Sequence, residues 1–181
     1  MKKFEEKTIK TEEIFKGKII NVTVDDVVLP NGQKSKRELV RHPGAVAIIA
    51  VTKEKKLVMV EQYRKPLEKS ILEIPAGKLE PEENHAVTAR RELEEETGFT
   101  SADLEYVTSF YTSPGFADEL LHIYYTDQLE VMEEKRELDE DEFVEVHEYN
   151  LSELKALQES GRIHDVKTVF AIQYLQLRHL Q

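Results

Sequence analysis

The 181-residue sequence contains no cysteine. Neither disulfide bonds nor thiolate metal sites can form without it, and this composition suits a reducing cytoplasm. The sequence also has no apolar run near the roughly 18 to 20 residues that a membrane-spanning helix requires. Its first lysines are followed by charged residues, where a signal peptide would be apolar. We therefore expect a soluble, cytoplasmic protein without a membrane partner.

Basic residues are comparatively few, with 25 Lys and Arg against 36 Asp and Glu, which gives a formal net charge of -11. Nucleic-acid binding depends on cationic contacts with phosphates, so this balance argues against a nucleic-acid partner. The excess carboxylates either solvate the surface or bind cations. Their positions must decide between these two interpretations.

Motifs of several large enzyme classes are missing. The sequence has no Gly-x-Ser-x-Gly elbow, no Gly-Lys-Ser/Thr phosphate loop and no Gly-x-Gly-x-x-Gly motif. Its six histidines show no metal-ligand spacing. Serine hydrolase, P-loop and dinucleotide-binding chemistries therefore find no support.

Hydrophobic patterning predicts an α+β fold. Alternating apolar residues near Val22, a turn at residues 30–33 and a second strand predict an N-terminal hairpin region with little core of its own. Two terminal helices are expected, capped by Asn150 and Asp165. Further strands are predicted at residues 45–51, 57–60, 71–74, 104–111, 120–125 and 143–146.

A glutamate-rich helix is predicted at residues 81–97, with Gly98 just past its end. On such a helix Glu92 and Glu96 stack on one face, and Glu95 lies beside them. Like charges at this spacing cost a few tenths of a kcal/mol per pair, whereas a hard divalent cation makes the cluster favourable. A solvated helix face is the ordinary interpretation of so many glutamates.

The spacing of glycine, glutamate and arginine in this segment favours cation binding, because residues 77–99 resemble the signature of the Nudix hydrolase family. In order the segment has Gly, five residues, Glu, seven residues, Arg-Glu, an apolar residue, any residue, Glu-Glu, any residue, Gly and an apolar residue. A chance match in a chain of this composition is on the order of 10⁻⁶. The resemblance implies a mixed sheet sandwiched between helices, and Mg²⁺- or Mn²⁺-assisted hydrolysis of a nucleoside diphosphate linked to another group.

The resemblance also implies roles for individual residues. The family's metal ligands, which hold two or three ions, correspond here to Ala76 through its backbone carbonyl, Glu92, Glu95 and Glu96. The residues that support this loop and helix correspond to Gly77, Glu83, Arg91 and Gly98.

Two further segments resemble the ADP-ribose pyrophosphatase branch of the family. They are residues 73–77, directly before the signature, and residues 112–119, where Pro114 lies 16 residues beyond Gly98. This resemblance implies hydrolysis of ADP-ribose to AMP and ribose 5-phosphate. Residues 61–64 resemble the strand of this branch that carries a phosphate-binding arginine, so Arg64 would bind a substrate phosphate. The other substrate-binding residues implied are Arg37 and Glu38, at the adenine end, and Pro114 and Gly115.

Related enzymes of this branch exchange N-terminal strands between two subunits. We therefore expect a strand region at residues 1–42 that forms a homodimer, followed by a Nudix hydrolase domain at residues 43–181. A hairpin with little core of its own is consistent with stabilisation by a second subunit.

The base that activates water has several candidates. In the ADP-ribose branch a glutamate of a distal loop enters the site, and Glu142 matches it by position, with Glu140 as a rival. Glutamates of the helix itself, Glu95 and Glu96, are the third possibility. Alternative functions are a broader nucleoside-diphosphate-sugar pyrophosphatase, a nucleotide-pool cleaning enzyme and an ADP-ribose-sensing module without activity.

Overall fold

The structure, a computed structural model, describes residues 3–134, 136–138 and 142–179. The chain divides into two compact units, the first formed by residues 1–44 and 110–121 and the second by residues 45–109 and 122–181. Within the described ranges no helix has the length and apolar character needed to cross a membrane.

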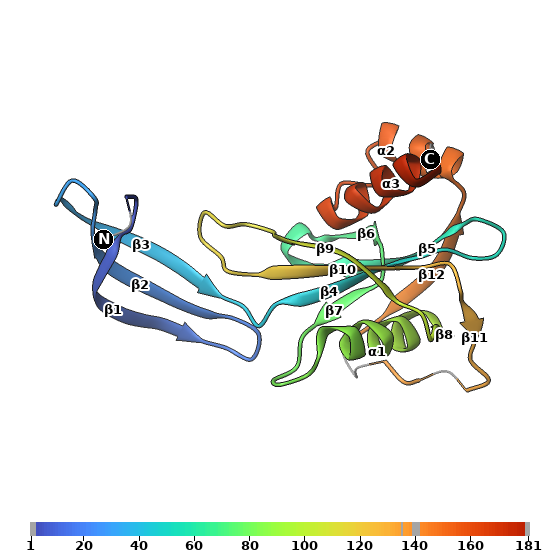
Figure 1. The fold of residues 1–181 in the computed structure, drawn as a ribbon, viewed down its shortest axis with the longest axis horizontal. Helices are drawn as coiled ribbons and strands as arrows, with labels where there is room; N and C mark the ends of the chain where they lie inside the picture. The colour runs from blue at the N-terminus through green and yellow to red at the C-terminus, as the bar shows by residue number, and fades with distance from the viewer. Residues whose placement is uncertain (1–2, 135, 139–141, 180–181) are drawn as a thin grey trace. The chain divides into compact units, whose positions relative to one another are not determined.

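The first unit contains a three-stranded antiparallel sheet in the order β1 (Lys7–Lys16), β2 (Asn21–Val28) and β3 (Lys34–Arg41) (Figure 1). The turn between β2 and β3 forms where the sequence predicted it, and Gly32 adopts a φ of +84° there. Every residue of β1 is exposed. The only buried residues described in the sheet are Val27 and Asp25, so this region has the small core that the sequence predicted.

The second unit contains the main hydrophobic core. One sheet has the order β7 (Ala76–Lys78), β4 (Ala45–Ala50), β10 (Leu120–Thr126) and β9 (Glu105–Tyr111). Another has the order β12 (Val144–Tyr149), β5 (Leu57–Arg64) and β6 (Lys69–Glu73), with a 3-10 turn at Lys65–Leu67 between β5 and β6. The short strands β8 (Phe99–Thr100) and β11 (Glu130–Val131) form a pair.

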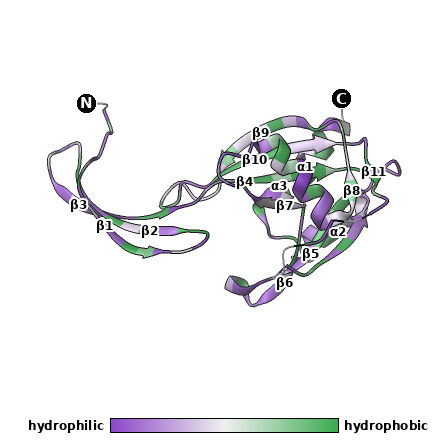
Figure 2. Ribbon diagram, turned by 90° about the horizontal axis from the view of Figure 1, so that it is seen from below, coloured by the Kyte–Doolittle hydropathy of each residue, from purple (hydrophilic) through white to green (hydrophobic). Residues whose placement is uncertain are grey.

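Helices flank these strands on both sides. Helix α1 (His85–Thr97) lies on one side, and α2 (Leu151–Glu159) and α3 (Val166–His179) lie on the other (Figure 1). All of β4 and the first half of β5 are buried, and Figure 2 shows hydrophobic residues concentrated in these central strands. This arrangement confirms the expected α+β fold with strands sandwiched between helices.

Helix α1 begins later than the sequence predicted. Glu82 has a φ of +66°, a left-handed conformation that cannot belong to a right-handed helix. The cap is Asn84, whose side chain accepts a hydrogen bond from the backbone N–H of Ala86 at 2.8 Å. The prediction of a start at residue 81 was therefore wrong, whereas Gly98 ends the helix as expected, with a φ of +73°.

The caps of the terminal helices are confirmed. Asn150 and Glu153 form a capping box at the start of α2, and Asp165 accepts a hydrogen bond from the backbone N–H of Thr168 at 3.0 Å at the start of α3. Leu177 of α3 is exposed, although helical spacing aligns it with Phe170 and Tyr174. The buried residues described in α3 are Thr168, Ala171, Ile172 and Leu175.

Candidate active site

The glycine at position 77 is required by the approach of a helix side chain. Glu92 of α1 places its carboxylate against β7, and a Cβ built on Gly77 would lie 1.9 Å from the Cδ of Glu92. Any side chain at this position would displace the carboxylate, since ordinary carbon contacts are about 3.5 to 4.0 Å. Gly77 therefore fixes where the Glu92 carboxylate lies.

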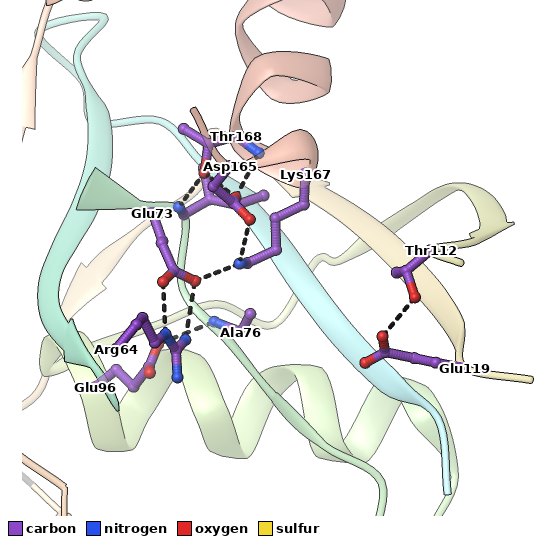
Figure 3. A network of polar contacts seen from close by, with 10 residues as sticks. Arg64, Glu73, Ala76, Glu96, Thr112, Glu119, Asp165, Lys167 and Thr168 are labelled. Atoms are coloured by element: carbon purple, nitrogen blue, oxygen red, sulfur yellow. Dashed lines mark hydrogen bonds and ion pairs between the residues drawn. The ribbon is translucent and has the colours of Figure 1, made fainter. Parts of the chain in front are cut away.

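A second carboxylate of α1 is tied to the segment before the signature. Glu96 is only 2% exposed, and its Oε2 accepts a hydrogen bond from the backbone N–H of Ala76 at 2.9 Å (Figure 3). Two of the predicted metal ligands, Ala76 and Glu96, are thus adjacent. The contact joins the strand β7 to the helix at the level of the glutamate cluster.

The negative charge of these helix carboxylates is incompletely balanced. Burial raises the pKa of Glu92 to about 7, and Arg91 offsets only part of this rise. Burial likewise raises the pKa of Glu96 to about 8, although the Ala76 N–H and Arg64 act against it. The charge of Glu142 raises the pKa of both residues. Glu142 therefore lies within electrostatic reach of the pair.

Arg91 connects three glutamates. Its guanidinium lies 3.3 Å from a carboxylate oxygen of Glu83 and 2.9 Å from those of Glu92 and Glu95. Burial by itself lowers the pKa of Arg91, but the three carboxylates more than offset this and raise it. Thr88 also donates to Glu83 at 2.9 Å. The pair of Glu83 and Arg91 expected from the sequence is present, and it holds the loop before α1 against the helix.

The arrangement of these glutamates differs from a closed coordination shell. In the part of the chain that the structure describes, no three Asp, Glu or His side chains converge closely enough to hold a metal ion. Glu95 is engaged by Arg91 instead. The donors nevertheless suit a hard divalent cation, because they are carboxylates and a backbone carbonyl, and two of the carboxylates lack a full counter-charge.

Arg64, the predicted phosphate ligand, is held in a fixed orientation at the end of β5. Its Nε and Nη2 donate to the two carboxylate oxygens of Glu73 at 2.6 and 2.9 Å (Figure 3). Glu73 is buried, whereas the Arg64 side chain keeps 39% of its surface exposed. The charge of Arg64 acts on Glu96, so this arginine lies in the electrostatic environment of the glutamate cluster.

The other predicted substrate residues belong to the first unit, whereas Arg64 and the glutamates belong to the second. Arg37 forms two hydrogen bonds with Glu6, at 2.7 and 2.6 Å, and Glu38 is exposed. Pro114 and Gly115 are exposed in the loop at residues 112–119. This loop is closed by a hydrogen bond from the hydroxyl of Thr112 to Glu119 at 2.5 Å (Figure 3).

The sequence does not identify the residues that support Arg64. Glu73 is visible only as part of a motif, and Lys167 and Thr168 carry no functional signal. Their positions, 94 residues beyond Glu73 and Ile74, gave no indication that they contact those residues. The only local signal was the cap residue Asp165.

Comparison with known proteins decides the family. The NUDIX domain model matches residues 40–170. The chain belongs to the Nudix family. This confirms the resemblance found in the signature. The nucleoside diphosphate sugar hydrolase N-terminal domain also matches this Nudix protein, at residues 6–40.

Two curated relatives cover nearly the whole chain. An ADP-ribose pyrophosphatase of Bacillus subtilis (strain 168) is 61% identical, over 98% of this chain and 96% of the relative. A methanol dehydrogenase activator of Bacillus methanolicus is 62% identical with the same coverage. A solved structure of an ADP compounds hydrolase has a TM-score of 0.82, with 22% identity, and covers 95% of this chain and 92% of the other. At this identity the solved structure supports the fold alone.

Proposed function

We propose that this Nudix protein hydrolyses the pyrophosphate bond of ADP-ribose, giving AMP and ribose 5-phosphate. The observation that carries the proposal is the buried pair of Glu92 and Glu96, which have raised pKa values and lie within a complete Nudix signature. The choice of substrate rests on the relative named ADP-ribose pyrophosphatase, at 61% identity.

Divalent cations fit the donor set. Mg²⁺ or Mn²⁺ would be held by the carboxylates of Glu92, Glu95 and Glu96 and by the carbonyl of Ala76, with two or three ions in a site. A cation held there would neutralise charge on the pyrophosphate and lower the pKa of a bound water. Glu92 and Glu95 would exchange their contacts with Arg91 for this role, and Arg91 would keep its contact with Glu83.

Arg64 and Glu142 would act on the substrate and on water. The exposed part of the Arg64 guanidinium would donate to a substrate phosphate while Glu73 keeps it oriented. Glu142 would accept a proton from the attacking water or orient it, and its electrostatic reach to Glu92 supports this role. The rival base, Glu140, lies outside the described residues.

The first unit would bind the adenine end and a second subunit. Arg37, Glu38, Pro114 and Gly115 would contact the nucleotide, as expected from the sequence. Residues 1–42 would form the homodimer contact, and residues 43–181 the catalytic domain. Large apolar side chains are exposed on and around β1, which supports its burial by another chain; they are Ile9, Ile14, Phe15 and Ile19.

Substrate comparison tests the proposal. Hydrolysis of ADP-ribose, ADP-glucose, GDP-mannose and oxidised nucleoside triphosphates would be measured side by side with Mg²⁺. We expect the highest kcat/KM for ADP-ribose, and a clear preference for triphosphates would overturn the assignment. Glu96→Gln should abolish most turnover, whereas Glu54→Gln, on an exposed loop, should leave it unchanged.

Two other functions have specific tests. An ADP-ribose sensor would bind ADP-ribose with Mg²⁺ present and leave it intact, but the complete signature argues against this. The relative named methanol dehydrogenase activator favours activation of a dehydrogenase as a second candidate. Adding wild-type protein and Glu96→Gln to a methanol dehydrogenase assay would reveal any activation and whether it requires hydrolysis.

A further inference from the structure

The first turn of α3 contacts Glu73, the carboxylate that orients Arg64. Lys167 donates from Nζ to Oε2 of Glu73, the same oxygen that accepts from Nη2 of Arg64 (Figure 3). Lys167 is itself held by Asp165, whose Oδ1 lies 3.0 Å from Nζ. The side chains of Lys167 and Glu73 are only 12% and 3% exposed. A largely buried network of ion pairs therefore joins Arg64, through Glu73, to Lys167 and Asp165.

The same turn also holds the segment that leads into the signature. The hydroxyl of Thr168 accepts a hydrogen bond from the buried backbone N–H of Ile74 at 2.9 Å and donates one to Oδ2 of Asp165 at 2.6 Å. Two residues after Ile74, the N–H of Ala76 donates to Glu96. The start of α3 thus supports both Arg64 and the backbone next to the glutamate cluster.

We propose that Lys167 is a positioning residue for phosphate binding, acting through Glu73 on Arg64. This inference rests on the proposed hydrolysis of ADP-ribose. Glu73 carries one negative charge and forms contacts with two cations. Lys167 neutralises part of that charge. Arg64 therefore keeps its orientation through the paired hydrogen bonds, and its positive charge stays available to a phosphate.

The geometry gives the two cations different roles, with Arg64 open to a ligand and Lys167 enclosed. Arg64 is more exposed than Lys167, at 39% against 12% of the side chain. The arginine can therefore touch a ligand, whereas the lysine is enclosed between Glu73 and Asp165. Without Lys167, the full charge of buried Glu73 would act on Arg64 alone, and the net positive potential offered to a phosphate would fall.

The test compares Lys167→Met with wild type, Lys167→Arg, Arg64→Gln and the double variant Lys167→Met/Arg64→Gln. The matched control is Lys155→Met, at an exposed lysine of α2. Turnover of ADP-ribose gives kcat and KM, and calorimetry gives the Kd of ADP independently of turnover. Melting temperatures show whether each variant is folded at the assay temperature. Lys167→Gln, which keeps a donor but not the charge, replaces Lys167→Met if the latter does not fold.

We expect Lys167→Met to raise the KM for ADP-ribose and the Kd of ADP about tenfold, with kcat nearly unchanged, because phosphate contacts act in ground and transition states alike. Lys167→Arg and Lys155→Met should behave as wild type. In the Arg64→Gln background, Lys167→Met should have no further effect, because its action passes through Arg64.

Two results would overturn the inference. One is a KM and Kd within twofold of wild type for the uncharged variant at position 167, and the other is an equal change with and without Arg64, which would indicate a general structural role. A wild-type protein that leaves ADP-ribose intact would contradict the proposed function instead. In that case the Kd of ADP still decides the role of Lys167.

Discussion

The contact between Gly77 and Glu92 makes a prediction whose magnitude follows from the structure. In Gly77→Ala the new Cβ would lie 1.9 Å from the Cδ of Glu92. A separation of at least about 3.5 Å requires the carboxylate to move by about 1.6 Å. Gly77 does not have a positive φ, so the backbone of an alanine there is not strained. The clash with Glu92 is therefore the main cost in stability.

Overpacking of this kind costs about 1 to 3 kcal/mol, and a displacement of more than 1 Å at a reacting site reduces the rate by about a hundredfold. Urea unfolding and ADP-ribose kinetics with Mg²⁺ measure the two effects for Gly77→Ala. The control is the same substitution in a Glu92→Ala background, where the colliding atoms are gone. The stability cost should vanish there. An equal cost with and without the Glu92 carboxylate would refute the reasoning.

Three further predictions concern pH, metal and a buried hydroxyl. Burial alone would raise the pKa of Glu73, but Arg64 and Lys167 hold it below its ordinary value of 4.5. The stability that this carboxylate contributes should therefore be complete above pH 4.5 and fall as the pH drops through the lower folded-state pKa. Acid unfolding of the wild type and of Glu73→Gln measures this loss. The pKa values of Glu92 and Glu96, about 7 and about 8, lie above their ordinary value of 4.5, so the metal-free protein should lose stability as the pH rises from about 4.5 to about 8. Saturating Mg²⁺ should remove this loss of stability and raise the melting temperature, and a chelator should reverse both effects. A melting temperature that Mg²⁺ does not change would contradict the cation site. Thr168→Val should lower the free energy of unfolding in urea by about 1 to 3 kcal/mol, because the buried backbone N–H of Ile74 loses its hydrogen-bond acceptor. A change below about 0.5 kcal/mol, which is typical of surface sites, would be inconsistent with this contact.

Local signals in the sequence predicted much of the fold. Gly98 ends α1 in the left-handed conformation, and Asn150 caps α2, because both effects depend on neighbouring backbone atoms only. The start of α1 was misplaced because two local signals competed. Pro81 suits a first helical turn, but Asn84 supplies the side-chain acceptor, and the left-handed Glu82 ends the preceding turn.

The contacts that orient the site could not be predicted in this way. The spacing of the signature placed Glu92 and Glu96 on one face of α1, but it gave no information on their burial. The pairing of Glu73 with Lys167 joins residues 94 positions apart, and only the packing of α3 against β6 brings them together. Tertiary packing, which no local pattern encodes, therefore decides which carboxylates receive a cation from the chain.

Glu73 and Glu96 show how this packing distinguishes a carboxylate that orients an arginine from one that is suited to bind a cation. Each is 2% exposed, so burial disfavours the charge of both. Glu73 contacts Arg64 and Lys167, and its pKa lies below the ordinary value. Glu96 accepts one backbone N–H and lies near other carboxylates, and its pKa rises to about 8. Because the folded chain balances the first charge and not the second, an external cation gains most at Glu96, while Glu73 serves to hold the arginine beside it.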